Sequence, residues 1–398
     1  METKNLTLIF SHFEKEHLGK DVFLVPYYLG KSLGYDTDIV YQKTKTNHSK
    51  YHRGVRLIPL KNLFFLPQLK ALSFFLRSLG YVISNGRKIN LLMTFHFRLK
   101  SAVLCFFYKI ANPDGQFYLK VDDEKDILHS RLSLLKKIFY KKFLVRIDYL
   151  SVETHAAYRL WKENKTVNTN LSQKLFLVEN GFDEDTLKEL RISVLPFAQK
   201  ENIIITVGRL GTYEKNTEMF LQAIENIKDM KNWKFCLIGS IENGFQKRIE
   251  DFFIKNPHLR DIVKFTRAIY DKKMLWEYYN RAKVFVLTSR WESYGLVLNE
   301  AYRFNNYIIS TYVGAAEEIL SKNNSFGKLI EQDNPTQLTH ILEDFINDKN
   351  SFNYSDKNHA NNSWENCLMP LIKAMKFHDF DNKGCFPLQC GVVIKNNN

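Results

Sequence analysis

The chain has 398 residues, of which 45% are hydrophobic, 14% aromatic and 25% charged. This composition is typical of a folded protein with two or three domains, and it excludes disordered, collagen-like and small disulfide-stabilised proteins. The 57 lysines and arginines exceed the 43 acidic residues and give a formal net charge of +14. Such an excess favours anionic partners, namely nucleotides, phospholipid surfaces or nucleic acid, without choosing among them.

Apolar runs and cysteines indicate the compartment. No apolar run approaches the ~18–20 residues of a membrane-spanning helix, and residues 1–10 lack the basic start and apolar stretch of a secretory signal. The five cysteines contain no C-x-x-C pair, so neither a disulfide framework nor a zinc ribbon is expected. We therefore expect a cytoplasmic protein.

The first half of the chain alternates short apolar runs with segments of helical length, which indicates an α/β domain. The expected strands are residues 6–10, 37–41, 91–95, 117–121 and 150–152. The expected helices are residues 19–33, 98–110 and 155–163. We assign residues 1–190 to this first domain.

Two segments of the first half do not fit the strand pattern. Residues 131–146 place six lysines and arginines among eight apolar residues, and residues 61–79 are also apolar and basic. A basic amphipathic helix is able to lie on an anionic membrane surface. It is equally consistent with a core-packing helix whose solvated side is basic, so both interpretations stay open.

The second half repeats the β-α pattern more regularly and predicts a doubly wound domain over residues 191–362. The expected strands are residues 203–207, 235–238, 263–265, 284–287 and 307–309. A helix is expected over 216–229, and others begin near Gly244, Asp271 and Tyr294. An Asn-Gly turn and a polar stretch place the hinge between 180 and 200.

The first motif of the second domain follows its first strand. Gly208, Arg209 and Gly211 occupy the turn, and Lys215 stands at the start of the next helix. Glycine allows close backbone approach, arginine binds phosphate oxygens through two N–H groups, and a helix start offers free N–H groups. The motif predicts a diphosphate site, although glycine turns with two surface cations occur in many α/β proteins.

The second motif is SRWESYGLVLNEA, which follows the strand at 284–287. We expect Glu292 at the start of a helix that also carries Glu300, so that the two carboxylates face one elongated ligand from opposite ends. The backbone amides of Ser293, Tyr294, Gly295 and Leu296 would add contacts to hydroxyls and phosphate. The carboxylate pair is also consistent with two surface glutamates on an amphipathic helix.

Taken in order, these motifs resemble the retaining GT-B glycosyltransferases of glycosyltransferase family 4 over residues 203–342, including the turn Tyr312–Glu317. The resemblance implies two Rossmann-like domains facing across a cleft. It also implies a donor that is a nucleotide-diphosphate sugar (UDP-, GDP- or ADP-linked), with no other cofactor and no metal. In this family the diphosphate is neutralised by residues matching Arg209 and Lys215, and the donor sugar and ribose are held by those matching Glu292 and Glu300.

The first domain resembles the family less. The turn 17–20 has one glycine where members often have two. Members also place a histidine near the reacting sugar, and two strand ends compete for that position, His96 and Asp122; strand order favours Asp122. The helix 367–375, preceded by Trp364, is similar to the family's last helix, which crosses back onto the first domain, and a loosely ordered tail is expected after Lys376.

The resemblance implies the activity of a hexosyltransferase. Such an enzyme transfers a sugar, with retention of anomeric configuration, to a hydroxyl of a glycan or lipid-linked glycan. We expect this reaction to belong to cell-surface polysaccharide biosynthesis. An anionic membrane surface contacted through residues 131–146 is a further expected partner, which would place the protein peripherally on the inner face of the membrane. A nicotinamide-dependent oxidoreductase would need G-x-G-x-x-G, which is lacking. The composition also permits a catalytically silent nucleotide-binding scaffold or a nucleic-acid-binding protein, but no nucleic-acid-binding module accompanies the charge, so we expect no nucleic acid.

Overall fold

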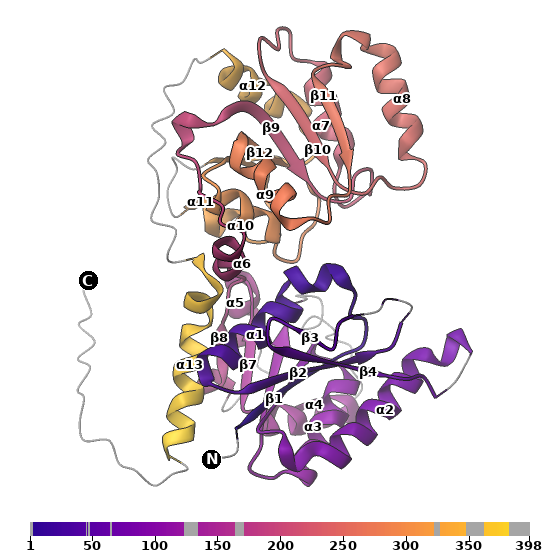
Figure 1. The fold of residues 1–398 in the computed structure, drawn as a ribbon, viewed down its shortest axis with the longest axis vertical. Helices are drawn as coiled ribbons and strands as arrows, with labels where there is room; N and C mark the ends of the chain where they lie inside the picture. The colour runs from indigo at the N-terminus through magenta and orange to yellow at the C-terminus, as the bar shows by residue number, and fades with distance from the viewer. Residues whose placement is uncertain are drawn as a thin grey trace, which may run out of the picture.

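The computed structural model describes residues 3–44, 46, 48–63, 66–122, 134–163, 171–321, 327–347 and 362–381. Each half of the chain builds its own β-sheet (Figure 1). Of the predicted basic segment 131–146, the first three residues lie outside the described ranges.

The first sheet has eight strands in the order β3-β4-β2-β1-β5-β6-β7-β8. Every pairing in it is parallel except that between β3 and β4. The strands are β1 (Asn5–Phe10), β2 (Asp36–Gln42), β3 (Tyr51–His52), β4 (Val55–Leu60), β5 (Leu91–Phe95), β6 (Gln116–Val121), β7 (Tyr149–Val152) and β8 (Leu175–Leu177). All five predicted strands are confirmed, and β3, β4 and β8 were not predicted.

Helices cover both faces of this sheet. One face packs on α1 (Asp21–Leu33) and α13 (Trp364–Asp381), around buried residues such as Phe23 and Leu368. The other face packs on the helices α2 (Lys70–Asn85), α3 (Leu99–Ala111), α4 (Leu134–Arg146) and α5 (His155–Glu163). Burial on both faces explains why the strands read as nearly continuous apolar runs.

The second sheet has six parallel strands in the order β11-β10-β9-β12-β13-β14. They are β9 (Glu201–Val207), β10 (Lys234–Ile238), β11 (Val263–Arg267), β12 (Ala282–Leu287), β13 (Tyr307–Thr311) and β14 (Gly327–Ile330). The surrounding helices are α7 (Thr217–Glu225), α8 (Phe245–Lys255), α9 (Lys272–Arg281), α10 (Leu296–Arg303), α11 (Ala316–Ser321) and α12 (Pro335–Ile346). The predicted doubly wound arrangement is confirmed, and the order 11-10-9-12-13-14 reverses direction between β9 and β12.

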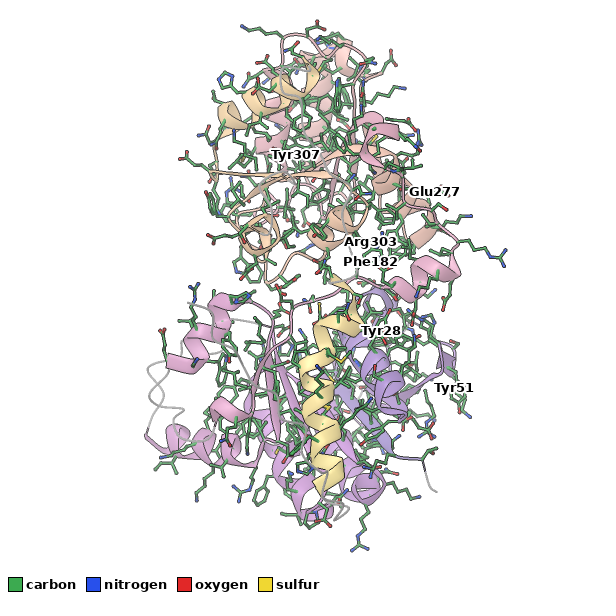
Figure 2. The ribbon with its side chains drawn as sticks, turned by 90° about the vertical axis from the view of Figure 1, so that its left-hand side faces the viewer. Tyr28, Tyr51, Phe182, Glu277, Arg303 and Tyr307 are labelled. Carbon is green, nitrogen blue, oxygen red and sulfur yellow. The ribbon has the colours of Figure 1, made fainter. Side chains whose placement is uncertain are left out.

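The last helix, α13, crosses back onto the first domain, as expected (Figure 2). Trp364 is fully buried at its start in the core shared with α1. The expectation of a loose tail after Lys376 is wrong for residues 377–381, because α13 continues to Asp381, and the rest of the expected tail, residues 382–398, lies outside the described ranges. His378 explains this in part, since its Nδ1 lies 2.8 Å from Nε2 of Gln116 on the sheet.

The connection between the sheets is tight at Gly181. A Cβ atom there would lie 2.3 Å from the backbone nitrogen of Trp364. We therefore expect Gly181→Ala to push α13 away and to lower the free energy of unfolding by about 1–3 kcal/mol, as overpacking does. Thermal unfolding tests this, with Gly80→Ala as control because no atom lies within 4 Å of its added Cβ. Equal melting temperatures for the two variants would contradict the expectation.

Candidate donor site between the two domains

The turn after β9 forms the first part of the site. Gly211 has φ +88°, and an added Cβ would lie 2.2 Å from the ring of Phe245, so only glycine fits. The Gly211 N–H donates to Oγ1 of Thr217, the first residue of α7, over 2.9 Å. A small hollow is lined here by Gly208, Arg209, Lys215 and the end of β12.

The two cations of this turn differ in their surroundings. Arg209 is exposed and makes no hydrogen bond or ion pair with any residue that the structure describes. Lys215 Nζ instead lies 2.5 Å from Oε1 of Glu292. An unengaged guanidinium at the carboxyl end of a parallel strand is placed to bind an anionic ligand.

Glu292 corrects one expectation. It lies in the loop between β12 and α10, four residues before the helix begins at Leu296, so the two glutamates do not share one helix. The reason is Gly295, whose φ of +83° places the helix start after it. The Glu292 carboxylate instead accepts hydrogen bonds from Lys215 and, over 2.6 Å, from the Ser289 hydroxyl.

A second hollow, of about 260 Å³, lies beside this loop. Glu292 and Ser293 line it together with the turn at Gly314 and the half-exposed rings of Trp291 and Tyr312. The Tyr294 side chain is buried in the core, and its carbonyl accepts from the N–H of Ala315 over 2.8 Å. Of the predicted set 293–296, Tyr294 therefore offers only its backbone to a ligand.

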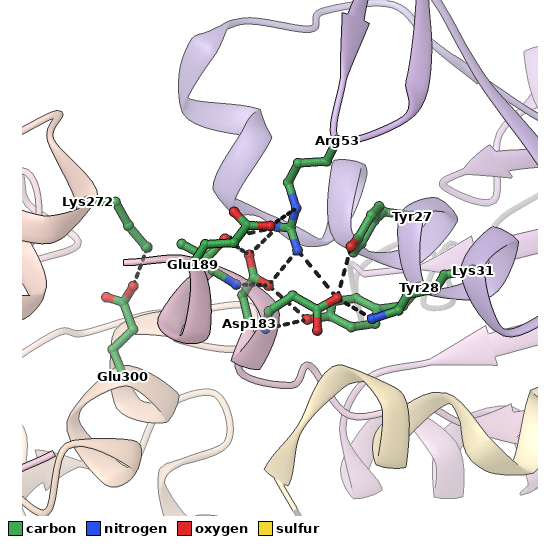
Figure 3. A network of polar contacts seen from close by, with 10 residues as sticks. Tyr27, Tyr28, Lys31, Arg53, Asp183, Glu189, Lys272 and Glu300 are labelled. Carbon is green, nitrogen blue, oxygen red and sulfur yellow. Dashed lines mark hydrogen bonds and ion pairs between the residues drawn. The ribbon is translucent and has the colours of Figure 1, made fainter. Parts of the chain in front are cut away.

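Glu300 lies on α10 and is held by two groups of α9 that were not predicted. Its Oε1 accepts from Lys272 Nζ over 2.5 Å and from Trp276 Nε1 over 3.0 Å (Figure 3 shows the lysine). Lys272 also lies 4.9 Å from the centre of the Trp276 ring. The i, i+4 spacing of Lys272 and Trp276 indicates that they lie on the same face of one helix. It does not indicate their carboxylate partner, because Glu300 is distant in the sequence.

In the first domain, the two competing residues form one pair. His96 follows β5 with φ +66°, and its Nδ1 lies 2.7 Å from Oδ1 of Asp122, which follows the neighbouring β6. Burial disfavours the charged carboxylate of Asp122, but the close contact with His96 and the charges of His96 and Lys120 hold its pKa below the ordinary value. Both residues therefore stand together at the carboxyl edge of the first sheet.

A buried cation beneath this pair was not predicted. Lys120 is fully buried, and its Nζ lies 2.7 Å from Oε2 of Glu153 and 2.9 Å from Oδ2 of Asp21. Burial raises the pKa of Glu153 to about 7, although the charge of Lys120 lowers it. The sequence did contain a signal, because Lys120 stands in an otherwise apolar run. A buried strand accommodates a lysine only when carboxylates compensate its charge.

Buried amides continue this cluster into the second domain. The side-chain amide of Asn180 donates to Glu153 Oε2 over 2.9 Å. The backbone carbonyl of Asn180 accepts from the side-chain amide of Asn299, the residue before Glu300. Asn362, just before α13, donates to Asn299 Oδ1 over 3.0 Å. A continuous buried chain thus joins the first sheet to the helix that carries Glu300.

The first domain also comes close to the hinge and to the second domain at three places. A Cβ on Gly19, in the turn after β1, would lie 3.7 Å from Lys272 Nζ. Glu318 of α11 accepts from the backbone N–H of His155, at the start of α5, over 3.0 Å. Arg53, at the tip of the β3–β4 hairpin, contacts Asp183 over 2.7 Å (Figure 3). Gly19 of the first domain thus lies close to Lys272, the ion-pair partner of Glu300.

Asp183 also shows how the hinge is built. Its side chain caps the short helix α6 (Glu184–Glu189) by accepting from Thr186 N–H over 3.2 Å. Tyr28 of α1 donates its hydroxyl to the same carboxylate over 2.8 Å. Desolvation of the Tyr28 phenol and the neighbouring Asp183 charge raise the pKa of that hydroxyl. The carboxylates of the hinge are thus bound to side chains of the first domain.

Comparison with known proteins agrees with the fold. The crystal structure of a glycosyltransferase from Rickettsia africae superposes with a TM-score of 0.69 at 15% identity and covers 95% of this chain and 99% of that one. The chain therefore has the GT-B fold, as the sequence predicted. Residues 188–362, which carry Arg209, Lys215, Glu292 and Glu300, match the model of the family glycosyl transferases group 1.

Two curated relatives match parts of the chain. An α-1,4-N-acetyl-D-galactosaminyltransferase of Campylobacter jejuni that acts on a diNAcBac-PP-undecaprenol-linked glycan is 32% identical over 155 residues, which are 38% of this chain and 40% of the relative. The amylovoran biosynthesis glycosyltransferase AmsD of Erwinia amylovora is 28% identical over 218 residues, 49% of this chain and 58% of the relative. The matched part of the chain therefore spans about half the length of these relatives.

Proposed function

We propose that the protein is a glycosyltransferase that moves a hexose from a nucleotide-diphosphate sugar to a hydroxyl of a glycan or lipid-linked glycan, with retention of configuration and without a metal ion. Residues 191–362 would bind the donor and residues 1–190 the acceptor. The observation that carries this proposal is the exposed, unengaged Arg209 beside the Lys215–Glu292 pair, in the part of the chain that matches the glycosyltransferase family.

The proposed reaction needs electrostatic stabilisation rather than a protein nucleophile. The acceptor oxygen bonds to the anomeric carbon on the face from which the diphosphate departs, while the bond from that carbon to the phosphate oxygen breaks. The acceptor proton passes to the departing phosphate. Arg209 and Lys215 line one hollow after β9, and together with the first N–H groups of α7 they would stabilise the negative charge that the leaving group gains in the transition state.

The carboxylates would orient the sugar nucleotide. Glu300 would accept hydrogen bonds from the ribose hydroxyls while Lys272 and Trp276 fix its position. Glu292 would hold the donor sugar, and the amides of Gly208, Ser293, Gly295 and Leu296 would contact phosphate and hydroxyls. His96 and Asp122, as a pair, would face the reacting sugar from the first domain.

The relatives support the choice of acceptor. One acts on an undecaprenol-linked glycan and the other takes part in amylovoran biosynthesis. We accordingly propose a role in cell-surface polysaccharide biosynthesis, at a cytoplasmic and peripheral position on the inner face of the membrane.

Turnover tests the proposal. Incubating the protein with a panel of UDP-, GDP- and ADP-hexoses is expected to release nucleoside diphosphate slowly from one of them, and faster when a lipid-linked glycan acceptor is added. Analysis of the product linkage by NMR should show the anomeric configuration of the donor. Inversion would contradict retention, and release from none of the donors would contradict the proposed activity.

Glu300→Gln should weaken donor binding more than it slows turnover. The amide keeps the shape and the Trp276 contact but loses the charge that Lys272 pairs with, so the donor KM is expected to rise about tenfold, the equivalent of one charged hydrogen bond. Glu277→Gln on exposed α9 surface is the control (Figure 2). A fall in kcat at unchanged KM would contradict ribose binding by Glu300.

A further inference from the structure

The helices α2, α3 and α4 present an unusual outer face on the first domain. Of the twenty large apolar side chains that are exposed among the described residues, eleven lie on these helices or on the segment that leads into α2. They are Leu63, Leu66, Leu72, Leu76, Ile83, Leu99, Phe106, Ile110, Ile138, Phe139 and Val145. We call this set the apolar face. Exposed apolar residues concentrated in this way mark an interaction surface.

The three helices form one continuous surface. Helix α3 packs against both α2 and α4, and the guanidinium of Arg146 on α4 lies 5.6 Å from the Phe106 ring on α3. Figure 1 shows them grouped on the side of the first sheet opposite to α13, at the end of the first domain away from the second. No helix among the described residues is both long and apolar enough to span a bilayer.

Charge identifies the partner. Helices α2, α3 and α4 contain nine lysines and arginines and no Asp or Glu. Residues 39–113 hold thirteen lysines and arginines and no acid, against a net charge of +14 for the whole chain. The nearby carboxylate of Asp148 is already paired with Lys109 over 2.7 Å. The helices that carry the apolar face are thus cationic, with no acidic residue in their sequences.

A cavity of about 810 Å³ adjoins the end of α2. Tyr81 and Asn85 of α2 form part of its wall, and Arg87 and Lys88, both exposed, stand at its side. Asp38 also lines the cavity but is paired with Arg56 over 2.5 Å. This cavity offers an anionic group cationic partners and enough space beside the apolar face.

We propose that the α2–α3–α4 face docks on the surface of an anionic phospholipid bilayer. Its apolar side chains would enter the boundary between headgroups and acyl chains, and its lysines and arginines would contact the anionic headgroups. Nucleic acid would match the charge but not eleven exposed aliphatic and aromatic side chains spread over three helices, whereas an anionic bilayer offers both headgroup charge and an apolar interior. This interface deepens the peripheral location proposed above, and it does not depend on glycosyl transfer.

Sedimentation with vesicles tests the docking face without any substrate. Wild-type protein should sediment with vesicles of phosphatidylcholine and phosphatidylglycerol in low salt, and should bind much less to pure phosphatidylcholine. The triple variant Arg77→Glu, Lys141→Glu, Lys142→Glu changes three exposed residues of the face. Its partition is expected to fall by at least about 100-fold, because each of the three cations contributes about a factor of five.

Two matched variants sharpen the result. Lys228→Glu, Lys231→Glu, Lys247→Glu makes the same charge change on exposed positions of the second domain and should bind nearly as wild type. Ile110→Ser, Ile138→Ser, Val145→Ser keeps the charge but removes apolar contacts, and should also reduce binding. Equal losses in the two charge variants, or no wild-type binding to anionic vesicles, would overturn the proposal. So would a stable dimer in light scattering that the serine variant dissociates, because a second copy would then cover the face.

Discussion

Arg209→Ala is expected to lower kcat for glycosyl transfer about 10²–10³-fold, the effect of removing one donor that stabilises developing negative charge. Arg209 has no ion-pair partner among the described residues, so its loss leaves no buried group unpaired and the fold should be unaffected. Steady-state kinetics with the active sugar nucleotide measures the change, and circular dichroism checks the fold.

Two variants make this result specific. Arg209→Lys keeps the charge but loses the two-pronged geometry, so its kcat should lie between those of wild type and alanine. Lys228→Ala removes an exposed cation from the same domain and should leave kcat unchanged. If Arg209→Ala turned over like Lys228→Ala, Arg209 would have no part in stabilising the leaving group.

Lys120→Met should produce the largest loss of stability in the chain. The substitution leaves the buried Glu153 and the partly buried Asp21 without their cation, and removing one partner of a buried ion pair costs about 3–5 kcal/mol. Urea unfolding followed by fluorescence should show a much lower midpoint for the variant, while Lys228→Met, on the surface, should stay close to wild type.

The loss of stability caused by Lys120→Met should grow as the pH rises. Burial already raises the folded-state pKa of Glu153 above its unfolded value, and removal of Lys120 raises it further. A group with a raised folded pKa contributes stability below its unfolded pKa and loses it as pH rises through the folded pKa. Lys120→Met should therefore be least harmful near pH 5 and most harmful near pH 8. Glu153→Gln in the same chain should restore stability at pH 8, and a loss independent of pH would contradict the charge argument.

The sequence predicted those parts of the fold that rest on local patterns. Fully buried parallel strands read as short apolar runs, so β1, β5, β9 and β12 were located within two residues. The hairpin of β3 and β4 was missed because it lies on the sheet's edge, where only β4 has a buried neighbour and the burial pattern is irregular. Edge strands have no strong periodic signal.

The residues of the candidate site also differ in whether a local pattern predicts their position. Gly208, Arg209 and Lys215 belong to one strand-turn-helix unit, so their spacing was sufficient to bring them together. The place of Glu292 depended on where α10 begins, which Gly295 decides through its backbone conformation. Lys120, Lys272 and Trp276 reach their carboxylates through tertiary packing, since their partners lie 24 to 99 residues away. No local pattern encodes such contacts.

Calorimetric titration of UDP, GDP and ADP into wild type, Arg209→Ala and Lys215→Ala tests the central claim most directly, because binding needs no acceptor. One nucleoside diphosphate should bind wild type with one site per chain, and each substitution should weaken it at least tenfold through the loss of a charged hydrogen bond. Failure of all three nucleotides to bind wild type, or unchanged affinity in both variants, would contradict a donor site at Arg209 and Lys215.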